Sequence, residues 1–293
     1  MTETVTLKAK DYKGSLPPVW CPGCGDFAVL NATQKALAAR GIKFEDVIFV
    51  SGIGCSSRFP HFMKAYGFHA VHGRALPVAT GLRLAMDDPT KHVIVVGGDG
   101  DGMAIGGGHF IHAARRNPNI TYIMMDNEIY GLTKGQASPT SEQGLKTKTT
   151  PYTDASKSAD QPLNPLAMAI MAGASHVSRA YSGAIKELVE LIGQAIDHKG
   201  YSFVQAISPC VTFNDIYEKA RAEQKTLESG HDTSNQMEAV VAAMKEHFAT
   251  GVFFENQRQT LDEAVHLQIE TAQKKADTGF AAMATQILKN AGY

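Results

Sequence analysis

The sequence is poor in several features that would each point to a particular class of protein. Lysine and arginine number 28 against 29 aspartates and glutamates, which gives a formal net charge of −1, and the basic residues are dispersed. Without a basic patch, neither nucleic acid nor an anionic membrane is an expected partner. The chain also has no uninterrupted apolar run long enough to span a membrane, and its first residues, MTETVTLKAKDYKG, lack an apolar signal region. We therefore expect a cytoplasmic protein.

Cysteine is scarce as well, with four residues in 293. Cys21 and Cys24 form a Cys-Pro-Gly-Cys pair, whereas Cys55 and Cys210 stand alone far downstream. Disulfides are disfavoured in the cytosol. Four thiolates drawn from three segments suit either a structural zinc ion or an iron–sulfur cluster. Zinc sites often use two CxxC pairs and only one is present, which favours a cluster. Zinc and unrelated buried cysteines stay open at this point.

The pattern of apolar residues indicates an α/β fold. With 44% hydrophobic residues the chain can bury a core of one large domain or two small ones. Short apolar runs bounded by glycine, proline or polar residues predict strands buried on both faces of a parallel sheet, at 46–50, 92–96, 120–125 and 201–207. Stretches of helical spacing or composition lie at 27–39, 75–86, 103–116, 165–172 and 182–198. We therefore predict a mostly parallel sheet covered by helices.

Two further segments have a different character. Residues 136–165 are rich in Ser, Thr, Lys and Pro and are expected to form a long loop, a kind of segment that is usually functional or mobile. From about residue 215 onward the chain is charged and helix-prone. We expect this part, 215–293, to form a helix-rich tail that packs on the domain formed by 1–214 or on a neighbouring subunit.

The residues that follow the predicted strands form one coherent set. In a parallel sheet, ligands gather beyond the carboxyl ends of the strands. The segments at these ends are SGIGC (51–55), GGDGD (97–101), Asp126-Asn127 and SPC (208–210). Two of the four cysteines and the best oxygen ligands should therefore share one edge of the sheet.

The GGDGD turn is better suited to a cation than to a dinucleotide. A dinucleotide-binding loop needs G-x-G-x-x-G, and Gly98-x-Gly100 is followed by Met103 where the third glycine should stand. Asp99, between two glycines at a strand end, can hold a hard cation that bridges to a diphosphate. Asn127 follows one strand–helix–strand unit later and can supply a second oxygen. The alternative is an ordinary glycine-rich turn with a solvated aspartate.

At this point the motifs resemble a known family. Gly98-Asp99-Gly100 followed by Asp126-Asn127 is similar to the fingerprint of thiamine diphosphate enzymes, with Asp126 where the broader fingerprint has Asn. Together with WCPGCG, SGIGCSS, HGRALPVATGLRLA, GHFIHAARRNPNITYI, DNEIYGLTKGQASPTS and SPCVTFND, these motifs resemble the β subunits of 2-oxoacid:ferredoxin oxidoreductases. The resemblance covers roughly residues 16–215 and is greatest to the members that use 2-oxoglutarate.

The resemblance implies a role for individual residues. The ligands of a 4Fe-4S cluster would be Cys21, Cys24, Cys55 and Cys210. The ligands of Mg²⁺ would be Asp99, Asn127 and the backbone carbonyl of Ile129. The surroundings of thiamine diphosphate would include Gly54, Cys55, His72, Gly73, Gly98, Gly100, Asp101, Gly131, Leu132 and Thr133.

Three residues are candidates for a catalytic role. His72 and Arg74 belong to the HGR segment expected near the cofactor, although His72 could instead be bonded to backbone. Lys134 lies close in sequence to the Mg²⁺ ligands and could neutralise the substrate carboxylate. The alternatives for Lys134 are a solvated lysine or a contact with a coenzyme A phosphate. The role of Arg58 is left open.

The implied activity is oxidative decarboxylation of 2-oxoglutarate to succinyl-CoA and CO₂. Thiamine diphosphate would support the decarboxylation, and the cluster would pass the electrons one at a time to ferredoxin. The reverse carboxylation is also conceivable. Residues 1–214 would bind both thiamine diphosphate and the cluster. An α subunit would supply the aminopyrimidine-binding domain, in an (αβ)₂ assembly.

Three alternatives remain at this stage. The same chemistry could act on pyruvate or on a broad range of 2-oxoacids. A non-catalytic iron–sulfur electron-transfer subunit would need the cysteines but have no use for Asp99 and Asn127. A zinc-stapled binding protein would need neither a redox cluster nor a diphosphate.

Overall fold

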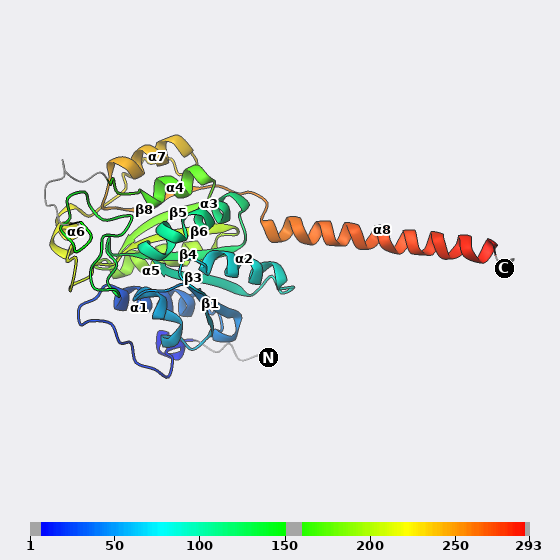
Figure 1. Cartoon of the computed structure of the whole chain (residues 1–293), viewed down its shortest axis with the longest axis horizontal. Coiled ribbons are helices and arrows are strands. Elements are labelled where there is room, and N and C mark those ends of the chain that lie inside the picture. Colours follow the sequence, from blue (N-terminus) through cyan, green and yellow to red (C-terminus); the bar gives the residue numbers. More distant parts are fainter. Residues whose placement is uncertain (1–6, 151–159, 291–293) are drawn as a thin grey trace.

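The computed structural model describes residues 7–150 and 160–290, which form an α/β structure around one eight-stranded sheet (Figure 1). The strands lie in the spatial order β2-β1-β3-β4-β6-β5-β8-β7. All neighbours pair in parallel except β5 and β8, which are antiparallel. The strands are β1 (Val47–Ser51), β2 (Tyr66–His69), β3 (His92–Gly98), β4 (Ile120–Asp126), β5 (His176–Tyr181), β6 (Tyr201–Ile207), β7 (Lys225–Thr226) and β8 (Ala249–Glu255).

Helices cover both faces of the sheet. One face packs against α1 (Asp26–Ala39) and α5 (Ile185–Asp197). The other packs against α2 (Ala75–Ala85), α3 (Gly107–Arg116), α4 (Pro165–Ala172) and α7 (Gln236–Lys245). The remaining helical elements are η1 (Ala9–Tyr12), η2 (Phe44–Asp46), η3 (Ser56–Phe62), the π-helical turn η4 (Gly100–Ile105), α6 (Tyr217–Glu223) and α8 (Leu261–Asn290). Figure 1 shows α8 extending away from the body of the protein.

The side chains of β3 explain why the central strands are apolar throughout. Val93 and Val95 pack in the core that contains α2, α3 and α4, whereas Ile94 and Val96 pack in the core that contains α1 and α5. Successive side chains of a strand point to opposite faces. A strand covered on both faces therefore has no solvent side and reads as a continuous apolar run.

The fold class and the four predicted strands are confirmed. The helices predicted at 27–39, 75–86, 165–172 and 182–198 correspond to α1, α2, α4 and α5 within three residues at each end. The helix predicted at 103–116 is divided into the π-helical turn η4 and the helix α3. No helix or regular strand occurs in the described part of 136–164, in agreement with the predicted loop, and residues 151–159 lie outside the described residues.

Four strands were not predicted: β2, β5, β7 and β8. The last of them matters for the C-terminal region, because β8 pairs with β5 and so adds a strand from this region to the main sheet. The division of the chain at residue 214 stays a prediction. None of the described helices combines the length and the apolar character needed to cross a membrane.

Phe110 provides a test of the packing between α3 and the sheet. It is fully buried, and its ring centroid lies 6.2 Å from that of Tyr122, 6.4 Å from that of Tyr201 and 5.0 Å from that of Phe203. Phe110→Ala should lower the free energy of unfolding by about 3–5 kcal/mol because it leaves a cavity among three rings. Ile111→Ala, at a 42% exposed position of the same helix, should change it by about 0.5 kcal/mol at most. Equal losses in urea denaturation would contradict this packing.

Candidate active site

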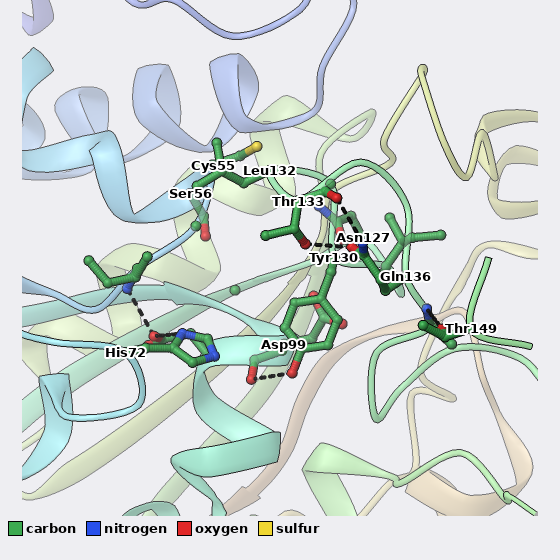
Figure 2. Close-up of a pocket in the computed structure, with 18 residues that line it drawn as sticks. Cys55, Ser56, His72, Asp99, Asn127, Tyr130, Leu132, Thr133, Gln136 and Thr149 are labelled. Carbon is green, nitrogen blue, oxygen red and sulfur yellow. Dashed lines mark hydrogen bonds and ion pairs between the residues drawn. The ribbon is translucent and has the colours of Figure 1, made fainter. Parts of the chain in front are cut away.

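A cavity of about 510 Å³ lies beyond the carboxyl ends of the central strands (Figure 2). This volume suits a small-molecule or cofactor site. Its walls come from the segments after β1, β2, β3 and β4 and from the loop that leads toward α4. The lining residues are Ile53, Gly54, Cys55, Ser56, His72, Gly98, Asp99, Gly100, Asp101, Asn127, Ile129, Tyr130, Gly131, Leu132, Thr133, Gln136, Ala137 and Thr149.

Asp99 has a buried carboxyl group that no basic side chain of the described chain contacts. It is 1% exposed, and its Oδ2 accepts a hydrogen bond from Thr140 Oγ1 at 2.8 Å. Thr140 Oγ1 also lies 2.9 Å from Asp126 Oδ1, although a hydroxyl has one hydrogen to donate. Burial, followed by the neighbouring Asp126 carboxylate, raises the pKa of Asp99. No lysine or arginine of the described chain pairs with Asp99. A bound divalent cation would compensate this charge.

The turn after β4 brings two more oxygen donors to the cavity. Asn127 and Ile129 both line it, and Glu128 between them adopts a left-handed backbone with φ of 57°. The side-chain oxygen of Asn127 accepts a hydrogen bond from the Ile129 N–H at 3.1 Å, which fixes the turn. The three residues predicted to bind Mg²⁺ therefore line one cavity, and carboxylate, amide and carbonyl oxygens are the donor set that Mg²⁺ prefers.

Gly100 allows the backbone and an aromatic ring to approach closely beside Asp99. A Cβ atom at this position would lie 2.2 Å from Cε1 of Tyr130, whose hydroxyl donates to the carbonyl of Gly100 at 3.1 Å. Only glycine fits there without moving the ring. Figure 2 shows Tyr130 between Asp99 and the loop that carries Gln136.

Asp101 joins three segments that form one wall of the cavity. Its Oδ1 accepts hydrogen bonds from the N–H of Ile53 at 2.9 Å and from that of Gly73 at 2.8 Å. The same oxygen lies 3.0 Å from Nδ1 of His72. The loop after β1 and the HGR segment are therefore both anchored on the turn after β3.

The candidate catalytic residues differ in their placement. His72 lines the cavity, whereas Gly73 and Arg74 are not among its lining residues. The guanidinium of Arg74 donates to the carbonyls of Gly73 and Ile105, each at 3.3 Å. Lys134 is exposed, has a backbone φ of 77° and does not line the cavity. A role for Lys134 in substrate binding therefore stays a prediction.

The four cysteines are free thiols that lie near one another, and Cys55 lines the cavity. A Cβ atom placed on Gly131 would lie 3.6 Å from Sγ of Cys210 and 3.8 Å from Sγ of Cys55. Burial, with Asp26 and Cys210 next in importance, raises the pKa of the Cys55 thiol to about 11. Burial followed by Asp26 also raises the pKa of Cys24, with added contributions from Cys210 and Cys55. A bound metal ion would compensate the charge of the thiolates and so favour their formation.

The distances between the cysteine sulfur atoms can be compared with those in a tetrahedral zinc site. In a tetrahedral zinc site with bonds of about 2.3 Å, the sulfur atoms would lie about 3.8 Å apart. No three of the four sulfur atoms, all within the described part of the chain, lie within 4.8 Å of one another. As a group, the four sulfur atoms are thus more widely spaced than the ligands of a tetrahedral zinc ion.

Several residues at the site were not predicted. Thr140, from the long loop, holds Asp99, and Gln205 donates to Asp126 Oδ2 at 2.6 Å while it accepts from Nε of Arg179 at 2.8 Å. Gln205 could have been found from the sequence, because it is the polar residue within the apolar run YSFVQAI. Nothing in the local sequence singles out Thr140 among the many Ser and Thr residues of its loop.

The fold and the site define a thiamine pyrophosphate enzyme domain. Residues 52–206 match the family described as thiamine pyrophosphate enzyme, C-terminal TPP binding domain. Residues 210–268 match the C-terminal part of the pyruvate ferredoxin oxidoreductase beta subunit.

Comparisons with individual proteins narrow the family further. The chain is 46% identical to 2-oxoglutarate oxidoreductase subunit KorB of Mycobacterium tuberculosis, over 76% of this chain and 60% of that protein. It is 38% identical to 2-oxoglutarate synthase subunit KorB of Methanocaldococcus jannaschii, over 87% of this chain and 94% of that one. It also superimposes with a TM-score of 0.87 on a 2-oxoglutarate:ferredoxin oxidoreductase from Magnetococcus marinus, at 42% identity over 93% of each chain. That structure has 2-oxoglutarate, coenzyme A and succinyl-CoA bound.

The chain belongs to the β subunits of the 2-oxoacid:ferredoxin oxidoreductases. The resemblance drawn from its motifs is thereby confirmed. The alignment spans 60% of the mycobacterial relative, so the activity, substrates and partners of the whole enzyme are taken up below as proposals.

Proposed function

We propose that this chain is the catalytic β subunit of a coenzyme A-dependent 2-oxoglutarate:ferredoxin oxidoreductase. The observation that carries the proposal is the position of Cys55, which lines the same cavity as Asp99 and Asn127. Gly131, in the same wall, is next to the sulfur atoms of both Cys55 and Cys210. A subunit that only carried electrons would need the cysteines but not a cavity with three convergent oxygen donors.

The residues of the site have complementary tasks in this proposal. Thiamine diphosphate supplies the carbanion chemistry that decarboxylates the 2-oxoacid, and a 4Fe-4S cluster on the four cysteines accepts the electrons. Asp99, Asn127 and the carbonyl of Ile129 hold Mg²⁺, while Thr140 orients Asp99. The other walls come from Gly54, His72, Gly98, Gly100, Asp101, Gly131, Leu132 and Thr133.

The partners follow from the same chemistry. Coenzyme A would take the succinyl group and ferredoxin the electrons, and the reverse carboxylation would use the same groups. An α subunit would supply the aminopyrimidine-binding domain, in a cytoplasmic (αβ)₂ assembly. The 2-oxoglutarate, coenzyme A and succinyl-CoA bound in the Magnetococcus marinus relative support this choice of substrate. The match of residues 210–268 to a pyruvate ferredoxin oxidoreductase family makes pyruvate, or a broad range of 2-oxoacids, the second candidate.

The substrate is tested by purifying the chain with its partner subunit and assaying a panel of 2-oxoacids. With coenzyme A and an electron acceptor present, kcat/KM for 2-oxoglutarate should exceed that for pyruvate by at least about tenfold, since each 1.4 kcal/mol of differential transition-state binding gives one factor of ten. Equal values would favour the broad-range alternative. A higher value for pyruvate would reverse the assignment.

The two cofactor sites are tested by variants that affect them separately. Asp99→Ala and Asn127→Ala should each lower the Mg²⁺-dependent content of thiamine diphosphate at least about tenfold and leave the iron content unchanged, because a hard oxygen ligand is lost. Cys210→Ser, which does not line the cavity, should lose iron and lower the melting temperature, because metal binding is coupled to folding.

Elemental analysis and cofactor quantification measure both outcomes. Undiminished thiamine diphosphate in both oxygen-ligand variants would contradict the magnesium assignment. Full iron content in Cys210→Ser would contradict the cluster assignment. Each set of variants is the control for the other.

The role of Lys134 is tested by steady-state kinetics in the assembled complex. If its ammonium group binds the substrate carboxylate, Lys134→Ala should lower kcat/KM for the 2-oxoacid at least about tenfold, or about 1.4 kcal/mol, with the KM for coenzyme A unchanged. Lys186→Ala, at an exposed position of α5, is the control and should have no effect. Unchanged 2-oxoacid kinetics in Lys134→Ala would assign this lysine to solvent or to coenzyme A.

A further inference from the structure

A second cluster of potential ligands lies at the opposite edge of the sheet from the cavity. His176 begins β5, His198 follows α5, and Glu255 ends the antiparallel strand β8. Nδ1 of His176 lies 3.4 Å from Oε2 of Glu255, and Nδ1 of His198 lies 3.8 Å from Oε1 of the same carboxylate. One ligand atom from each of the three residues falls within 4.8 Å of the other two.

The two imidazoles are buried, and three of their four nitrogens make no hydrogen bond of good geometry. The side chains of His176 and His198 are 1% and 2% exposed. Within the described chain, neither nitrogen of His176 has a hydrogen-bond partner, and neither has Nδ1 of His198. Buried polar atoms are nearly always satisfied, so these three nitrogens call for an explanation.

The tautomer of His198 is determined by its neighbours. Ser175 Oγ donates to Oδ1 of Asn117 at 2.7 Å, because that oxygen also accepts the N–H of Tyr201 at 2.8 Å and has no hydrogen of its own. The same Ser175 Oγ lies 2.8 Å from Nε2 of His198 and must accept there. Nε2 of His198 therefore carries the hydrogen.

In the neutral ring, Nδ1 of His198 then presents a lone pair to the carboxylate of Glu255. A lone pair and a carboxylate oxygen repel each other unless a proton or a metal ion lies between them. A hydrogen bond from the far nitrogen that fixes the tautomer is also the usual arrangement around a metal-bound histidine.

We propose that His176, His198 and Glu255 form a binding site for a divalent transition-metal ion of the zinc class. Two imidazoles and a carboxylate are a common ligand set for zinc. At metal–ligand distances of about 2.0–2.1 Å, tetrahedral ligands lie about 3.4 Å apart, close to the 3.4 Å between Nδ1 of His176 and Oε2 of Glu255. Glu255 is 44% exposed, which leaves the fourth position open to water.

The site would fasten the end of β8 to the main sheet. The chain leaves this point toward α8, and two backbone bonds guide it: Asn256 N–H to Ser175 O at 2.9 Å and Leu261 N–H to Asn117 O at 3.0 Å. Ser175 and Asn117 are the same residues that orient His198. A bound ion would therefore stabilise the base from which α8 extends.

The site is tested by zinc titration of the full-length chain in its purified assembly, after exposure to a chelator that leaves the iron content unchanged. Calorimetry should give one zinc ion bound per chain, with iron still unchanged at the end of the titration, and binding should raise the melting temperature. Glu255→Gln keeps the shape of a half-exposed side chain and should weaken zinc binding at least about tenfold. His176→Ala should abolish it.

His112→Ala is the control, because this exposed histidine of α3 lies next to His109 and represents an ordinary surface pair. It should leave the zinc affinity unchanged. If His176→Ala fails to fold, Glu255→Gln decides alone. The proposal is overturned if no saturable zinc binding occurs, if Glu255→Gln binds zinc as tightly as the unmodified chain, or if His112→Ala is the variant that loses binding.

Discussion

Parallel pairing of β1, β3, β4 and β6 is the constraint on which the site depends. Four strands that run in the same direction must end at the same edge of the sheet. The segments that follow them carry Cys55, Asp99, Asn127 and Cys210, although up to 155 residues separate these positions in the chain (210 − 55). Neither the thiol cluster nor the oxygen donors exist as a local motif, so a loss of strand register would disperse both at once.

A buried line of polar groups runs from that edge into the sheet. Arg179 donates to Gln205, Gln205 donates to Asp126, and Thr140 lies between Asp126 and Asp99. Burial lowers the pKa of Arg179 to about 10, against the opposing effect of Asp126, so the guanidinium stays charged at neutral pH. Arg179 is thus linked through neutral groups to two buried carboxyl groups. Burial and Asp126 raise the pKa of Asp99, so a bound cation would be needed to keep its carboxylate ionised.

The sequence predicted best those strands that are apolar on both faces and end in functional residues. Strands β1, β3, β4 and β6 are apolar runs in the sequence because helices cover both faces of the sheet. The residues that follow them predicted that Asp99 and Cys55 lie at the same edge. Strand β5, HVSRAY, was missed because its buried His176, Ser178 and Arg179 interrupt the apolar run, and the distant groups that bind Arg179 leave no local pattern. Strand β8 was missed because charged segments flank it, and Thr140 because its contact with Asp99 spans 41 positions.

The C-terminal region has a closer connection to the site than its charged composition indicated. The carbonyls of Glu246 and Ala249, before and at the start of β8, accept hydrogen bonds from the guanidinium of Arg179, and Phe253 lies 5.2 Å from it. A buried guanidinium needs such acceptors to remain charged. Since Arg179 in turn compensates Asp126, β8 helps to maintain the electrostatics of a cavity that it does not line. The other end of β8 carries Glu255, so an ion bound there would hold the strand whose first residues contact Arg179.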